Sequence, residues 1–143
     1  MPAVRLAALT ADPLDVVAHL AAVASPQAGA VATFVGQVRD HDAEAAGEVV
    51  LLDYSAHPSA PDVLRGLANE VAAREGVLGL AVSHRTGTLH VGDAAIVACI
   101  ATAHRDLAFV LCRELVERVK AELPVWKRQL VADGTHHWVG VDG

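Results

Sequence analysis

The segment that decides the fold runs from residue 94 to residue 131 and reads AAIVACIATAHRDLAFVLCRELVERVKAELPVWKRQLV. Its first part, 94–102, is an apolar run with the length and composition of a buried strand. From Arg105 to about Leu123, apolar residues recur at helical spacing, and Pro124 ends this helix. The segment therefore predicts a buried strand followed by a long helix that covers it.

The rest of the chain predicts shorter elements on both sides of this unit. Short strands joined by hairpins alternate irregularly with helices, which favours the α+β class over a doubly wound parallel sheet. The 143 residues fit one domain, 1–143. The predicted strands are 5–9, 29–38, 49–56, 78–84 and a short piece between turn glycines in 87–93, with a C-terminal hairpin of 126–131 and 136–141 around Asp133-Gly134. The predicted helices run from Asp12-Pro13 to about Ser25 and from Ser59 to just before Gly76, and 39–48 is a polar loop.

Composition narrows the class of protein. Hydrophobic residues make up 53% and charged residues 20%, which disfavours a disordered chain. The longest apolar run, 94–103, is about half the length that spans a bilayer, and the N-terminus does not resemble a signal peptide. A cytoplasmic location is the expectation. The net charge of −6 disfavours nucleic-acid binding, so an anionic ligand requires a local cluster of basic residues.

Neither cysteine nor histidine forms a metal-binding pattern. Cys99 and Cys112 are far apart in the sequence and are expected to be buried apolar residues. The eight histidines show no HxH or HExxH spacing. The sequence therefore predicts no metal site and no bound cofactor.

The two lysines are the first candidate catalytic residues. The chain has nine arginines but only Lys120 and Lys127, on either side of Pro124. A desolvated lysine can lose its proton and act as a base or a nucleophile. The alternatives are that Lys120 is a solvated helix residue paired with Glu117, and that Lys127 is an ordinary edge-strand lysine.

Three arginine positions are candidates for binding an anion. His104-Arg105 stands where the long helix begins, and a helix N-terminus favours phosphate. The alternative is that Arg105 pairs with Asp106 or Asp93. Arg39 opens the polar loop, where a solvated arginine is the alternative, and His84-Arg85 is a similar case.

Several segments, taken in order, resemble the large subunit of molybdopterin synthase. The resemblance covers about residues 28–139. It lies in ATFVGQVR (32–39), HRTGTL (84–89) with Gly92-Asp93, AHR (103–105) with Ala108-Phe109, Lys120 with PVWKR (124–128), and Gly134 with Trp138-Val139.

This resemblance implies an α/β-hammerhead-like fold with an additional antiparallel sheet or hairpin. It also implies a homodimer in which each copy binds a small ubiquitin-like sulfur carrier through the carrier's C-terminal Gly-Gly tail. The implied activity is a sulfurtransferase that moves two sulfurs from the thiocarboxylated carrier to cyclic pyranopterin monophosphate, forming molybdopterin.

The resemblance also assigns roles to individual residues. Lys120 is implied as the main catalytic residue, either as a base or as a group facing the carrier's terminal carbonyl, with Lys127 in support. The residues implied to bind the phosphate or the pterin are Arg39, His104 and Arg105, with Phe34 as a pocket wall or, alternatively, a core residue. A non-catalytic carrier-docking or phosphate-binding scaffold of the same fold is the alternative function, because no arginine follows Trp138-Val139.

Overall fold

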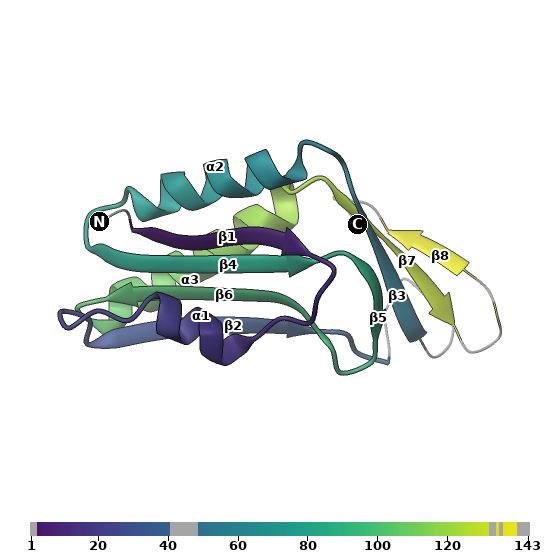
Figure 1. Ribbon diagram of the computed structural model, residues 1–143, viewed down its shortest axis with the longest axis horizontal. Coiled ribbons are helices and arrows are strands. Elements are labelled where there is room, and N and C mark those ends of the chain that lie inside the picture. Colours follow the sequence, from purple (N-terminus) through teal and green to yellow (C-terminus); the bar gives the residue numbers. More distant parts are fainter. Residues whose placement is uncertain (1–2, 41–48, 132–133, 135, 140–143) are drawn as a thin grey trace.

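The computed structural model describes residues 3–40, 49–131, 134 and 136–139. Within this part of the chain, strands and helices are mixed (Figure 1), which confirms the predicted α+β class. In chain order the elements are β1 (Val4–Thr10), α1 (Val16–Ala22), β2 (Ala30–Gln37), β3 (Val49–Ala56), α2 (Ala60–Ala72), β4 (Val77–Arg85), β5 (Gly87–His90), β6 (Ala94–Thr102), α3 (Arg105–Glu122), β7 (Val125–Val131) and β8 (His136–Val139).

The strands form two four-stranded sheets. The first has the order β1-β4-β6-β2, in which β1 and β4 are parallel and the other neighbours antiparallel. The second has the order β5-β3-β7-β8 and is antiparallel throughout. Figure 1 shows the second sheet beyond one end of the first, where β2 ends and β6 begins.

Both faces of the first sheet are buried, because successive side chains of a strand point to opposite sides. On one face, Leu80, Val82 and Ile100 pack against α2 and α3. On the other face, Ala81 and Val97 pack beneath α1. A third cluster joins the two sheets and consists of Val38, Leu52, Leu89, Ala95 and Val131.

The segment 94–131 folds as predicted, with β6 at 94–102, α3 at 105–122 and β7 from Val125. The turn glycines Gly87 and Gly92 both have positive φ, 83° and 93°, which is the conformation that favours glycine. The predicted hairpin is also present as β7 paired with β8, although Asp133 of its turn lies outside the described residues. Residues 41–48 of the predicted loop 39–48 also lie outside them.

The prediction that the first helix begins at Asp12-Pro13 was wrong. Helix α1 begins at Val16, after Asp15, whose side chain accepts a hydrogen bond of 3.0 Å from the Ala18 backbone N–H. The backbone N–H of Asp12 instead donates to the Thr10 hydroxyl at 3.0 Å. The carbonyl of the preceding residue, Ala11, accepts a hydrogen bond from Arg85 of β4, so a tertiary contact holds the chain here and the helix begins only after the second aspartate provides the cap.

The corner between β4 and β5 is held by buried polar groups. The Arg85 guanidinium donates to the Ala11 carbonyl at 2.9 Å and lies 3.5 Å from the Asp93 carboxylate. His84 Nδ1 donates to the Arg85 carbonyl at 2.7 Å, and its ring lies edge-on to Tyr54 with centroids 5.0 Å apart. His84-Arg85 is therefore a structural pair and not a solvated loop site.

Burial of His84 makes the stability of the fold depend on pH. Burial lowers the pKa of His84, so below the ordinary value of 6.5 the unfolded chain binds a proton that the folded chain does not. The free energy of unfolding should fall as the pH drops from 7.5 toward 5.5, by up to about 1.4 kcal/mol per pH unit for this group. His84→Phe should remove this component, measured as the difference between the two proteins in urea unfolding at each pH. Equal pH dependence in both would contradict the prediction.

Candidate functional site

The candidate residues on α3 lie at its two ends. His104 is the N-cap and Arg105 the first helical residue, whereas Lys120 lies in the last turn. All three side chains are exposed. At a rise of about 1.5 Å per residue, the Cα atoms of Arg105 and Lys120 are about 22 Å apart. The helix therefore keeps the two ends too far apart to touch one small ligand.

Strand β2 shows which candidates share an end. Ala30 pairs with Thr102 at the end of β6 from which α3 starts, and Gln37 pairs with Ala94 at the opposite end. Helix α3 returns along β6 and so runs in the direction of β2. Arg39, which follows β2, and Lys120 therefore lie toward the same end, the one beside the second sheet (Figure 1). His104 and Arg105 lie at the other end.

Lys127 also belongs to the end beside the second sheet. It is a half-buried residue of β7, paired with Tyr54 of β3 on one side and Val139 of β8 on the other. The edge-strand alternative is wrong, because β7 is an interior strand. By strand alternation, Lys127 shares the face of Tyr54 and Gln129, which is the face turned toward the first sheet. The structure thus gathers three of the predicted residues at one end: Arg39, Lys120 and Lys127.

Hydrogen bonding distinguishes most of the other arginines from the candidates. Six of the nine donate to protein oxygens: Arg5, Arg65, Arg74, Arg85, Arg118 and Arg128. Within the described residues, Arg39 and Arg105 have no hydrogen-bond or ion-pair partner, as is also true of Arg113 in the middle of α3, and Asp93 pairs with Arg85. Lys120 is exposed, as its solvated alternative expects, but it does not pair with Glu117 in this part of the chain. The unpaired cations are available to an anionic ligand.

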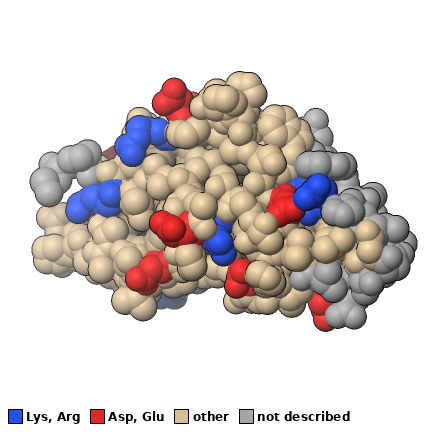
Figure 2. All heavy atoms as spheres, turned by 45° about the vertical axis from the view of Figure 1, so that its right-hand side comes forward, with Lys and Arg blue, Asp and Glu red and all other residues tan. Residues whose placement is uncertain are grey.

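The surface charge is otherwise mixed. Figure 2 shows acidic and basic side chains interspersed on the face that it presents, with neutral surface between them. The net charge of −6 gives no general attraction for anions. Any anion site therefore depends on a few local cations.

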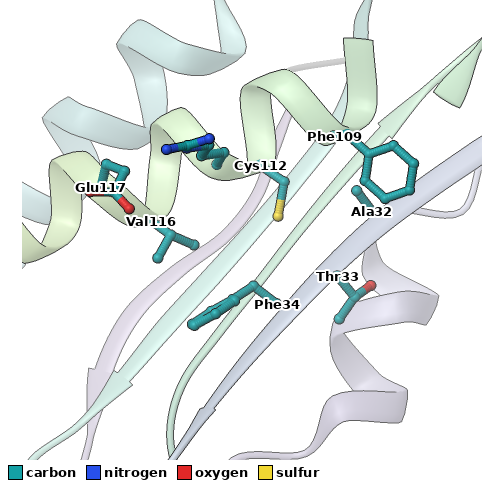
Figure 3. Close-up of a pocket in the computed structure, with 8 residues that line it drawn as sticks. Ala32, Thr33, Phe34, Phe109, Cys112, Val116 and Glu117 are labelled. Carbon is teal, nitrogen blue, oxygen red and sulfur yellow. The ribbon is translucent and has the colours of Figure 1, made fainter. Parts of the chain in front are cut away.

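Phe34 lies in a pocket between β2 and the middle of α3 (Figure 3). Its side chain is 37% exposed, which rules out the alternative of a fully buried core residue. The pocket is mostly apolar and is lined by Ala32, Thr33, Phe34, Phe109, Cys112, Arg113, Val116 and Glu117. It lies between the two groups of basic residues and not at either of them.

Comparison with known proteins gives the family. The sequence profile of the MoaE protein family matches residues 9–122. Molybdopterin synthase catalytic subunit 1 of Mycobacterium tuberculosis is 43% identical over 136 residues, covering 92% of this chain and 88% of that protein.

The chain belongs to the MoaE family.

One solved structure supports this membership, and a second shares the fold. Molybdopterin synthase from Staphylococcus aureus has a TM-score of 0.84 and 25% identity, covering 95% of this chain and 97% of that one. A protein–protein complex of subunits 1 and 2 of the molybdopterin-converting factor from Helicobacter pylori has a TM-score of 0.71. At 18% identity, with 96% of this chain and 90% of that one covered, it shows the shared fold alone.

The described residues of this MoaE-family chain contain no group of three potential metal-ligating side chains. None of the helices in that part is both long and apolar enough to cross a membrane.

Sequence reasoning missed the apolar surface beside the pocket. The helical pattern identified the buried stripe of α3, but Phe109 and Val110 on its outer side are 66% and 61% exposed. Two adjacent large apolar residues outside the predicted stripe were the available signal. A helix with a second apolar face commonly packs against another element or another molecule.

The two cysteines of this MoaE-family chain are buried thiols, as predicted. Cys99 lies 3.4 Å from the Thr33 hydroxyl, and Cys112 donates to the Ala98 carbonyl at 3.8 Å. Burial raises the pKa of Cys99. Burial, together with the nearby Cys99 thiol, raises the pKa of Cys112 to about 11. Since the thiolate is the nucleophile, neither is suited to carry sulfur near neutral pH.

The thiols should therefore react slowly in the folded protein. With a pKa of about 11, fewer than about one Cys112 in a thousand is ionised at pH 7.5. Ellman's reagent at pH 7.5 should label the native chain at least about tenfold more slowly than free cysteine, and both thiols at full rate in urea. Rapid labelling of either thiol in the native state would contradict this prediction.

Proposed function

We propose that this chain is the catalytic subunit of a molybdopterin synthase. It transfers two sulfurs from a thiocarboxylated, ubiquitin-like small subunit to cyclic pyranopterin monophosphate. The names of its relatives support this activity. The observation that carries the proposal is the gathering of Arg39, Lys120 and Lys127 at one end of an acidic molecule.

The roles of the lysines follow from their chemistry. Lys120 acts as a base or faces the terminal carbonyl of the carrier's Gly-Gly tail, and Lys127 supports it. An exposed amine at the end of a helix is accessible to a tail that arrives from another protein. Because the sulfur arrives on the carrier, the chain needs no nucleophilic thiol of its own.

The phosphate-binding roles require a second copy of the chain. Arg39 lies with the lysines, but His104 and Arg105 are one helix length away, about 22 Å from Lys120. One copy cannot bring both groups to one substrate. A homodimer can do so if a two-fold axis crosses α3 near its middle, because Arg105 of one copy then faces Lys120 of the other.

The pocket surface is suited to this dimer. The midpoint between Arg105 and Lys120 falls between Cys112 and Arg113, both of which line the pocket. Phe34 and Phe109 expose apolar surface there. In the described part of the chain, β2 is an edge strand of the first sheet, and such an edge favours association. A two-fold axis at this place makes the contact self-complementary.

Mixing two inactive variants tests the shared site. Lys120→Ala and Arg105→Ala should each lower the rate of molybdopterin formation at least about a hundredfold as homodimers, since each removes a charge from both sites. A mixed dimer has one site with both residues intact and one with neither. After unfolding and refolding together at equal amounts, about one quarter of the wild-type rate should return.

Arg65→Ala is the control, because Arg65 is exposed on α2 and lies in neither group. It should leave the rate unchanged. Turnover by Lys120→Ala alone would remove that residue from the mechanism. No recovery on mixing would show that the two groups do not share a site. Absence of turnover in the wild-type pair of subunits would favour the scaffold function.

The proposed dimer surface can be tested separately. Phe109→Glu should give a monomer, because it places a charge on each side of the apolar contact and near its own copy across the axis. Analytical ultracentrifugation should show the change, and molybdopterin formation should be lost with it. Val17→Glu is the matched control: Val17 is 73% exposed on α1, on the opposite face of the first sheet, and should leave the dimer intact. A dimeric Phe109→Glu would place the interface elsewhere.

A further inference from the structure

Tyr54 lies directly across from Lys127 in the second sheet. The two residues are register partners between β3 and β7, so their side chains project from the same face. Directly opposed Cβ atoms in an antiparallel pair are about 5 Å apart. Among the described residues, Tyr54 is thus the cross-strand neighbour of Lys127 on β3, and the two side chains leave the sheet side by side.

The Tyr54 ring is fixed from the side of the first sheet. It packs against the cluster that joins the two sheets and lies edge-on to the ring of His84, at 5.0 Å and 83°. His84 is itself held by its 2.7 Å hydrogen bond to the Arg85 carbonyl. The Tyr54 ring is therefore held from β4 through His84, and Tyr54 is in turn the register partner of Lys127.

The charges around this series suit a lysine. A carbonyl oxygen accepts, so His84 Nδ1 carries the proton of that hydrogen bond, and burial lowers the pKa of the ring. His84 is therefore neutral near pH 7 and does not repel a nearby ammonium. The Arg128–Asp53 ion pair, at 2.6 Å, belongs to the next residue pair along the two strands and so projects from the opposite face.

We propose that Tyr54 is a positioning residue for Lys127. The Tyr54 ring, held in place by His84, restricts the lysine side chain and directs its amine toward the site. The importance of this restriction for sulfur transfer rests on the proposed function. The restriction itself does not. A lysine that is free to rotate loses entropy when it is ordered in a reaction, and a fixed wall removes part of that loss.

The presence of only two lysines allows a direct measurement. Reductive methylation with ¹³C-formaldehyde keeps the positive charge and labels Lys120, Lys127 and the N-terminal amine, so NMR shows few signals. Lys127→Arg assigns the Lys127 signal by its disappearance. In the intact chain, Tyr54→Leu should shift the Lys127 signal, and Tyr54→Phe, which keeps the ring, should leave it close to its wild-type position. The Lys120 signal is the internal control.

Two further variants make the outcome decisive. His84→Ala removes the brace without changing β3 and should also move the Lys127 signal, so it decides the matter if Tyr54→Leu does not fold. Trp126→Leu removes an aromatic ring on the other face of β7, where Trp126 is 39% exposed, and should move the signal less than Tyr54→Leu does. An unchanged Lys127 signal in both Tyr54→Leu and His84→Ala would overturn the proposal.

Kinetics of the assembled synthase then test the consequence. Tyr54→Leu should lower kcat about tenfold with KM for the carrier changed less than about twofold, and Tyr54→Phe should restore most of the rate. An altered Lys127 signal with normal kcat would overturn the positioning role. If the Lys127 signal moves in the variants as expected but the assembled wild-type protein forms no molybdopterin, that result counts against the proposed function alone.

Discussion

The rigid length of α3 is the constraint on which the site depends. A helix of 18 residues is about 27 Å long, and it holds His104-Arg105 at one end of the first sheet and Lys120 at the other. Hydrogen bonds to a phosphate act over about 3 Å, so no side-chain motion joins these groups in one copy. If both serve one substrate, association is part of the catalytic apparatus, and the apolar middle of α3 becomes as important as the charged ends.

The hydrogen bonds of the arginines also distinguish residues that stabilise the fold from candidate site residues. Where an arginine only stabilises the fold, it has an acceptor: Arg118 bonds to Glu122 and Glu70, and Arg74 bonds to Glu114. An acidic chain has many carboxylates available for this purpose. A cation that has no carboxylate partner among the described residues is therefore notable. Cations that lie toward one end of the molecule attract an anionic ligand together.

Sequence patterns predicted the fold where burial and periodicity agree. The run 94–102 and the stripe of α3 have unambiguous periods, and Pro124 cannot continue a helix, so these boundaries were correct to about one residue. The predicted start of α1 was wrong because Asp12 and Asp15 can both cap a helix, and only the tertiary course of the chain selects between them. The site was less predictable. The pattern found the unusual residues, but no local pattern shows that α3 runs along β2 or that Tyr54 faces Lys127. Those contacts come from strand pairings between residues distant in the sequence.

If the sulfur arrives on a partner protein, the candidate catalytic residues of this chain can be lysines and not cysteines. A chain that carried sulfur on its own cysteine would need an exposed thiol of low pKa, which is prone to oxidation and exchange. Here both thiols lie in the core around β6, where burial raises their pKa values and leaves them as packing groups. In the proposed function, delivery of sulfur by a partner separates the reactive atom from the rigid scaffold. Under that proposal the scaffold has only to orient the carrier's tail and bind an anion, and amines and guanidinium groups on a rigid helix and an interior strand are suited to both.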